Sequence, residues 1–360
     1  MSKVLRIIFI ILLLTISILS AIIPSSKNKE NYKSPQEVQK ASIFYNNSTN
    51  EWKIIMNSTD SINAVAYAEY STTLESIGWD TLIITTNQNG NEIYSDEILA
   101  YGSGYLEGFL TKNRILNHYK NVKEDTWGGS IYNGKMPDNV RNYLKNQRKY
   151  IEDQYKLHNE LSNRNSYSNS SYSSNSSNYW KLVYCIQLQL EGVINGYNQN
   201  MDKEFYIDYE DFNSMNSDGD IGDIKFYLDL SKAPDFKNMP LEELIKYIHT
   251  HNHCTALIKV SPDFKDLWFG HNTWTSYSSM NRIFKEYNFK FSNPLQKATN
   301  IMFSSYPGTI NSIDDFYITN QDLVVMETTN TFLNIALYAL LTPNSLLTWH
   351  RAMLANFVAI

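Results

Sequence analysis

The order of apolar and polar positions predicts that the chain begins with short strands. Apolar and polar residues alternate over 41–45 and 52–56, and the turn-forming segment 46–50 separates these two runs. Alternation of this kind is typical of strands with one buried face, and the polar turn between them predicts a hairpin. Further strands are expected over 64–70 and 81–85.

Helical spacing dominates the next part of the chain. Apolar residues recur every three or four positions over 94–116 and 137–158, which predicts two helices. The first contains glycines within Gly102-Ser-Gly-Tyr-Leu-Glu-Gly108. A glycine costs a helix about 1 kcal/mol, so we expect these glycines to serve close packing. Residues 179–197 are apolar enough for a buried helix or strand.

Two polar segments interrupt this pattern. Residues 162–178 are almost purely Ser, Asn and Tyr, and they bury too little apolar area to offset their ordering entropy. We therefore expect a mobile surface loop at 162–178. Residues 211–220 are expected to form an acidic turn. This turn lacks the ligand spacing and the closing Glu of a calcium loop, and no metal site is expected anywhere in the chain.

From Cys254 onward, strands and helices are mixed. The pattern predicts strand, turn and strand, followed by a helix over 275–287. Later elements are expected to be strands at 296–304, 316–319 and 323–329 and a helix at 346–357. Together with the first part of the chain, this predicts an α+β fold.

Composition narrows the classes of function. The 360 residues are 42% hydrophobic and 14% aromatic, which is ample for a large core. The formal net charge is −6, with both signs interspersed along the chain. Nucleic-acid binding needs a concentrated basic face, so it is not expected.

The N-terminus has the features of a secretory signal. Lys3 and Arg6 precede an apolar stretch at 7–19, and small residues come just before Pro24, which predicts a signal peptide over 1–21. An uncleaved signal anchor is the alternative. Five acceptor sequons for N-glycosylation support entry into the secretory pathway, at Asn46, Asn47, Asn57, Asn169 and Asn175. A secreted or lysosomal location is therefore expected.

The chain has two cysteines, Cys185 and Cys254, too few for a disulfide scaffold. A bond between them would make Cys254 structural. Cys185 lies in apolar company, where cysteine acts as a small hydrophobe, so we expect it to be inert. Cys254 begins a strand-like run, and Ser261-Pro-Asp263 reads as a turn. A symmetric hairpin about this turn would place Cys254 opposite His271.

Three arrangements could make Cys254 a nucleophile. A papain-like site needs the cysteine at a helix N-terminus, but residues 255–260 look like a strand. A dyad with His271 is the second possibility. In the third, cleavage of the peptide bond before Cys254 gives the residue an α-amine with a pKa of about 7.7–8.0, a base suited to neutral pH. The residues alone leave the choice open.

Several motifs resemble the phospholipase B-like family, in the expected order and across nearly the whole mature chain. They are His253-Cys-Thr-Ala-Leu-Ile-Lys-Val260, Gly270-His-Asn-Thr-Trp274 with its continuation to Met280, Met326-Glu-Thr-Thr-Asn330, and the segments at 104–108, 187–192, 306–315 and 349–356.

The resemblance implies an N-terminal nucleophile hydrolase with a four-layer αββα sandwich. Self-cleavage between His253 and Cys254 would give fragments 22–253 and 254–360, which remain partners. His271, Trp274 and Thr328 would lie beside the catalytic thiol. The implied reaction is deacylation of phospholipids, with contact to a membrane surface and without a cofactor.

One departure from the family stands out at the C-terminus. The family's chains continue past the segment matching 349–356, so we expect an incomplete sandwich and impaired catalysis. The alternatives are a non-catalytic lipid-binding or inactive family member, and an amidase or peptidase on the same scaffold.

Overall fold

The computed structural model describes residues 37–87, 93–128, 134–164, 171–251, 254–328 and 332–358. All of them belong to one of the two units into which the chain divides, Glu37–Ile360. The expected signal peptide at 1–21 lies outside the described residues.

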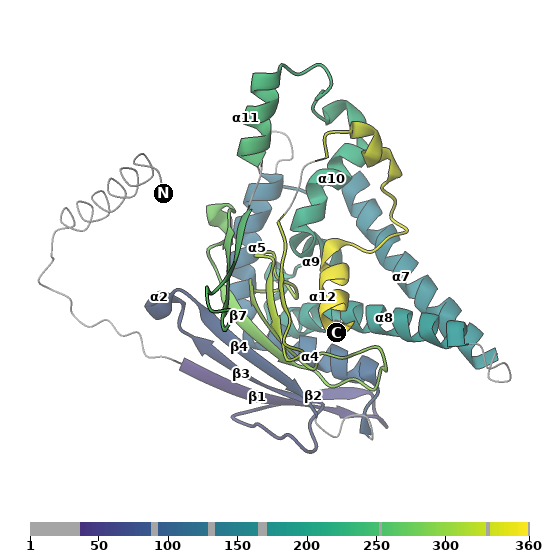
Figure 1. Ribbon diagram of the computed structural model, residues 1–360. Helices are drawn as coiled ribbons and strands as arrows, with labels where there is room; N and C mark the ends of the chain where they lie inside the picture. The colour runs from purple at the N-terminus through teal and green to yellow at the C-terminus, as the bar shows by residue number, and fades with distance from the viewer. Residues whose placement is uncertain are drawn as a thin grey trace, which may run out of the picture. The chain divides into compact units, whose positions relative to one another are not determined.

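An eight-stranded mixed sheet organises this unit (Figure 1). Its order is β10-β9-β8-β7-β4-β3-β1-β2. The strands are β1 (Glu37–Asn46), β2 (Glu51–Met56), β3 (Ala66–Thr72), β4 (Asp80–Thr86), β7 (Ile283–Asn288), β8 (Asn300–Ser305), β9 (Phe316–Thr319) and β10 (Val324–Met326). Neighbouring strands are antiparallel except for β4 and β7, which run parallel. A parallel pair needs a crossover connection, and here the connection contains most of the helices.

The helices α4 (Asp96–Leu110) and α8 (Ser171–Asn198) pack against each other, and α4 also contacts β1, β3 and β4. A Cβ atom on Gly104 would lie 1.9 Å from the carbonyl oxygen of Gln189, and one on Gly108 would lie 2.0 Å from that of Val193. The two helix backbones therefore touch, and the close-packing role expected for the glycines is confirmed.

Most of the remaining helices lie to one side of the sheet, above it in Figure 1. The remaining helices are α2 (Leu74–Ile77), α5 (Lys112–Trp127), α7 (Asp138–Arg164), α9 (Tyr209–Asn216), α10 (Asp218–Leu228), α11 (Leu241–His251) and α12 (Thr348–Val358), with short 3-10 turns η1 (Lys203–Phe205), η2 (Leu230–Lys232), η3 (Tyr277–Ser279) and η4 (Ile335–Leu340). Of the helices that the structure describes, none has the length and apolar character needed to cross a membrane.

The Ser/Asn-rich segment differs from the expected loop. Helix α7 extends to Arg164 and α8 begins at Ser171, so helices occupy much of 162–178. The buried face of α8, which includes Leu182, Ile186 and Leu190, fixes the helix against its neighbours. Once a helix is nucleated, each further residue adds a hydrogen bond, which offsets the weak propensity of Ser and Asn.

Two other predictions of local structure are wrong. The expected helix at 275–287 is instead the turn η3 followed by β7, because Ile283, Lys285 and Tyr287 alternate with less buried residues and face the core. The expected acidic turn at 211–220 is helical, divided between α9 and α10. In α9, Asp208 caps the N-terminus by accepting a hydrogen bond from the backbone of Asp211.

Most of the other predicted elements are present within a few residues of their expected limits, and the α+β class is confirmed. The second sheet consists of β5 (Cys254–Val260) and β6 (Leu267–Thr273) alone. Most of its side chains are exposed, including those of Leu257, Ile258 and Trp268.

Candidate functional site

The hairpin of β5 and β6 places Cys254 at its open end, but with a different partner from the one expected. Cys254 pairs with Thr273, not with His271, so the register differs by two residues. The cause is a longer turn, in which the Ser261 N–H donates to the Asp266 carbonyl at 2.8 Å and Phe264 has a φ of 56°. A two-residue shift keeps each side chain on its face, so His271 still lies diagonally next to Cys254.

Cys254, His271 and Asp315 form a compact cluster. The Cys254 Sγ, a ring nitrogen of His271 and a carboxylate oxygen of Asp315 all lie within 4.8 Å of one another. Both cysteines are free, which rules out a disulfide between Cys185 and Cys254. Cys185 is buried, and burial holds the pKa of its thiol well above the ordinary value, as expected for an inert residue.

Hydrogen bonds fix the ring of His271. Its Nε2 lies 2.7 Å from the carbonyl oxygen of Glu327. Since a carbonyl only accepts, Nε2 carries a proton, and in the neutral ring the lone pair is on Nδ1. The Thr273 hydroxyl lies 3.3 Å from Nδ1 and donates to the carbonyl oxygen of Asp314 at 3.1 Å. When the ring is neutral, Nδ1 can accept a proton or hold a metal ion.

The electrostatic surroundings disfavour the thiolate of Cys254. Burial raises the pKa of this thiol, and the negative charges of Asp315, Asp314 and Glu327 raise it further, while a hydrogen bond from the backbone of Trp274 lowers it. Burial also raises the pKa of Asp315 to about 8, with contributions from Glu327 and Asp314. Cys254 is therefore mainly a thiol at neutral pH and needs a base to act as a nucleophile.

Cys254 lines a cavity of about 1020 Å³. This volume is at the upper end of the range of about 300–1,000 Å³ that is typical of small-molecule sites. Trp274 and Thr328, both expected beside the thiol, line this cavity and are exposed. A ring nitrogen of His271 lies within 4.8 Å of the Cys254 sulfur, but His271 does not line the cavity. His253 lies outside the described residues.

Two residues of the cavity wall, His118 and Asn311, were not predicted from the sequence to belong to the site. His118 is buried and stacks on Tyr306 with a ring separation of 5.3 Å; burial lowers its pKa to about 3, and the charge of Lys285 adds to this. Neither His118 Nδ1 nor Asn311 Oδ1 has a hydrogen-bond partner among the described residues. Buried polar atoms of this kind are usually paired, so both are suited to a polar group of a ligand.

Asp315 is the third residue that the sequence did not assign to the site. It lies in the segment 306–315, which carried part of the family resemblance but suggested no role for it. Its proximity to Cys254 arises only when the turn after β8 folds against the hairpin.

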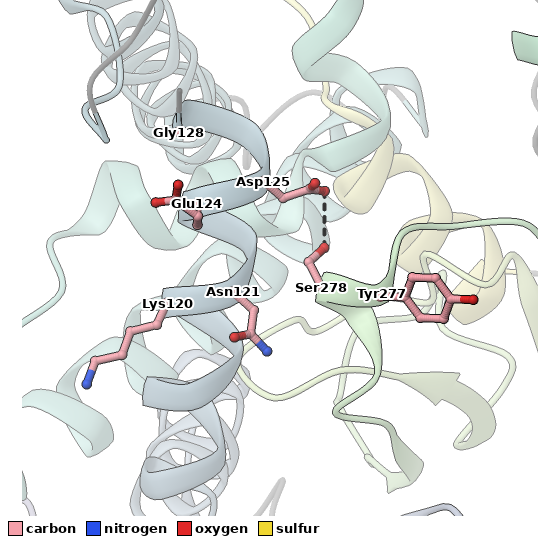
Figure 2. A pocket seen from close by; sticks show the side chains of 7 residues that line it. All are labelled: Lys120, Asn121, Glu124, Asp125, Gly128, Tyr277 and Ser278. Carbon is pink, nitrogen blue, oxygen red and sulfur yellow. Dashed lines mark hydrogen bonds between the residues drawn. The ribbon is translucent and has the colours of Figure 1, made fainter. Parts of the chain in front are cut away.

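A smaller depression of about 600 Å³ adjoins the large cavity and shares Asp125 and Ser278 with it. Figure 2 shows its two walls, helix α5 with Asp125 on one side and the η3 segment with Ser278 on the other. The Ser278 hydroxyl donates to Asp125 at 3.1 Å, and that of Ser276 donates to the same carboxylate at 2.8 Å. These bonds attach the η3 segment, which follows the hairpin, to α5.

Comparisons with known proteins all identify the same family. The phospholipase B family profile matches residues 66–360. Phospholipase B-like protein A of Dictyostelium discoideum is 32% identical, with 98% of this chain and 58% of the relative covered. Phospholipase B of Crotalus adamanteus is 31% identical, covering 82% and 50%, and human phospholipase B-like 1 is 29% identical, covering 82% and 49%.

The chain thus spans about half the length of the curated relatives it matches. The profile nevertheless covers most of the described residues, including the hairpin, the cluster at Cys254 and the cavity wall. The chain belongs to the phospholipase B family.

Proposed function

We propose that this chain carries the nucleophile of an acyl hydrolase that removes fatty acids from phospholipids, and that this nucleophile is Cys254. The observation that carries the proposal is the position of the thiol: it is on the first residue of β5 and opens into the cavity of about 1020 Å³. The names of the relatives, which are phospholipases B and phospholipase B-like proteins, support the class of substrate.

The proposed activation step is self-cleavage between His253 and Cys254. The new α-amine of Cys254 then takes the thiol proton, the thiolate attacks the acyl carbonyl, and the alcohol leaves with the proton. Water hydrolyses the resulting thioester and regenerates the thiol. A base on the same residue suits this site because the pKa of the thiol is raised, so the thiolate does not form readily without one.

The fold is compatible with such a cut. Strands β4 and β7, which would belong to the two proposed fragments 22–253 and 254–360, pair over six residues from Asp80↔Ile283 to Thr85↔Asn288. The fragments would therefore share one sheet and stay associated. We further propose that the fold is a four-layer αββα sandwich whose second sheet includes β5 and β6.

Mass spectrometry of the purified protein tests the proposal directly. We expect a fragment that begins at Cys254, and we expect the Cys254→Ala variant to remain one chain and to release no fatty acid from phospholipid vesicles. The Cys185→Ala variant is the matched control and should be processed like the parent. An unprocessed parent chain without acyl release would instead favour a non-catalytic lipid-binding protein.

A second candidate is a Cys/His amidase that works without self-cleavage. A ring nitrogen of His271 lies within 4.8 Å of the thiol sulfur, which favours it. This candidate predicts an uncleaved chain whose hydrolysis of amide substrates is lost in both Cys254→Ala and His271→Ala.

We also propose a secreted or lysosomal location. The sequon asparagines Asn46, Asn47, Asn57 and Asn175 are exposed, so a glycosyltransferase could reach them; Asn169 lies outside the described residues. Treatment of the protein from a eukaryotic secretory host with an N-glycosidase should reduce its apparent mass. A protein whose mass is unchanged by the glycosidase would argue against this location.

A further inference from the structure

We propose that Cys254, His271 and Asp315 form a binding site for Zn²⁺, in which the bound ion holds the sulfur of Cys254 and keeps it from acting as a nucleophile. The sequence predicted no metal site because Asp315 lies far from the hairpin along the chain. The proposal concerns metal binding by these three side chains and is independent of the reaction proposed above.

The ligand atoms suit zinc. Thiolate sulfur, imidazole nitrogen and carboxylate oxygen are the three donor types that zinc takes in proteins. With metal–ligand distances near 2.0–2.3 Å, tetrahedral ligand atoms lie about 3.5 Å apart. The three atoms here lie within 4.8 Å of one another. Side-chain rotations that bring them about 1 Å closer would complete the site.

The imidazole of His271 already has the orientation that a metal ligand needs. Metal-binding histidines usually donate their second ring N–H to a carbonyl or carboxylate, which fixes the ring and its tautomer. His271 donates from Nε2 to the carbonyl oxygen of Glu327 at 2.7 Å, so Nδ1 of the neutral ring, 3.3 Å from the Thr273 hydroxyl, is the nitrogen that can hold an ion. This second interaction is separate from the cluster itself and supports a ligand at Nδ1.

The charges around the thiol also favour a cation. Asp314 and Glu327 act on Cys254 with negative charge, and Asp315 adds to it once its carboxyl has lost its proton. The described residues that line the cavity include one arginine, Arg351. Its guanidinium lies 3.9 Å from the carboxylate of Asp220, which partly balances the positive charge. A divalent ion at the cluster would offset the acidic groups and stabilise the thiolate. The sulfur and nitrogen ligands select zinc over calcium or magnesium, which prefer oxygen.

Three protein ligands leave a fourth position of the ion open. Cys254 and Asp315 both line the cavity, so this position faces the space where a substrate would lie. A zinc-bound thiolate gives electron density to the ion, so its sulfur is a weaker nucleophile than that of the free thiolate. Zinc would therefore protect Cys254 from alkylation, whether or not the protein is a hydrolase.

Cobalt titration of the purified, reduced full chain tests the site. Co²⁺ is expected to bind once per chain and to give a sulfur-to-metal charge-transfer absorption, which Zn²⁺ abolishes by displacement. Cys254→Ser should remove this absorption. His271→Ala and Asp315→Asn should each weaken Zn²⁺ binding by at least about tenfold, as judged by calorimetry, while circular dichroism verifies that each variant is folded.

Two control variants distinguish this site from other ligands in the chain. Cys185→Ser removes the other sulfur and should leave the absorption unchanged. The double variant His249→Ala/His251→Ala removes nearby histidines of the sequence and should also bind as the parent does. The proposal is overturned if the parent binds no Co²⁺ or Zn²⁺, if Cys254→Ser retains the absorption, or if only the double variant loses it. Loss of acyl hydrolysis alone would leave the metal result unaffected.

Discussion

Lys285 and Glu107 form a fully buried ion pair, with the ammonium nitrogen 2.6 Å from Oε1 of the carboxylate. The ammonium also donates to the carbonyl oxygens of Tyr306 and Thr309, and the Tyr287 hydroxyl donates to the second carboxylate oxygen at 2.5 Å. Burial lowers the pKa of Lys285, and the charge of Glu107 opposes that shift. The pair joins helix α4 to strand β7, on opposite sides of the proposed cleavage point.

Removal of one partner should destabilise the fold strongly. The Glu107→Gln variant leaves the ammonium of Lys285 buried without its counter-charge, so we expect the free energy of unfolding to fall by about 3–5 kcal/mol in urea denaturation. Asp153→Asn is the control, because Asp153 pairs with Lys149 at the surface. That change should cost less than about 1 kcal/mol. Equal, small losses in the two variants would contradict the structural role of the buried pair.

The close contact between α4 and α8 predicts that alanine at Gly104 destabilises the fold, whereas alanine at an open helical position does not. The Gly104→Ala variant places a methyl group 1.9 Å from the carbonyl oxygen of Gln189, so the helices must separate. We expect a loss of about 1–3 kcal/mol or more in thermal unfolding. Gly219 in α10 has open space around its Cβ position, and Gly219→Ala should be neutral or stabilising by up to about 1 kcal/mol. A Gly104→Ala variant as stable as the parent would show that the helices can repack.

These two cases show what the sequence could and could not reveal. The cost of glycine in a helix pointed to close packing at Gly104, although nothing local identified Gln189 as the residue it meets. The pattern also led to a helix at 275–287, because Lys285 is polar and its burial depends on Glu107, which lies far away in the chain. Long-range pairing of this kind overrides local periodicity.

The candidate site shows the same limit. The hairpin between Cys254 and His271 could be predicted from two apolar runs and a turn, but its register could not, because that depends on the left-handed backbone of Phe264. Asp315 enters the site from a separate turn, and the sequence alone contained no sign of this approach.

Acidic neighbours should make the alkylation of Cys254 dependent on Asp315. Iodoacetamide reacts with the thiolate, and the pKa of Cys254 is raised by burial and by nearby carboxylates, so the labelling rate should increase with pH beyond neutrality. Asp315 carries its negative charge above about pH 8, so Asp315→Asn lowers the thiol pKa there and should speed labelling severalfold above pH 8, with a smaller effect at pH 7.

Peptide mapping assigns the label in this experiment to one cysteine or the other. Buried Cys185 should remain unlabelled in the folded protein. A variant that is labelled no faster than the parent at any pH would show that Asp315 does not influence the thiol.

Asp315 should also give the stability of the fold a distinct pH dependence. Its pKa is raised from 3.8 to about 8, mainly by burial, so between about pH 4 and pH 8 the folded state holds a proton that the unfolded state has released. Stability from this group is therefore present at low pH and decreases as the pH rises through that window. Asp315→Asn cannot titrate at this position. The free energy of unfolding of the parent, relative to that of the variant, should therefore decrease between pH 5 and pH 8.

Asp263→Asn, at the exposed hairpin turn, is the control. The stability of the parent relative to this variant should not decrease over the same pH range. Parallel pH profiles for the parent and Asp315→Asn would mean that Asp315 is ionised in the folded protein throughout this range.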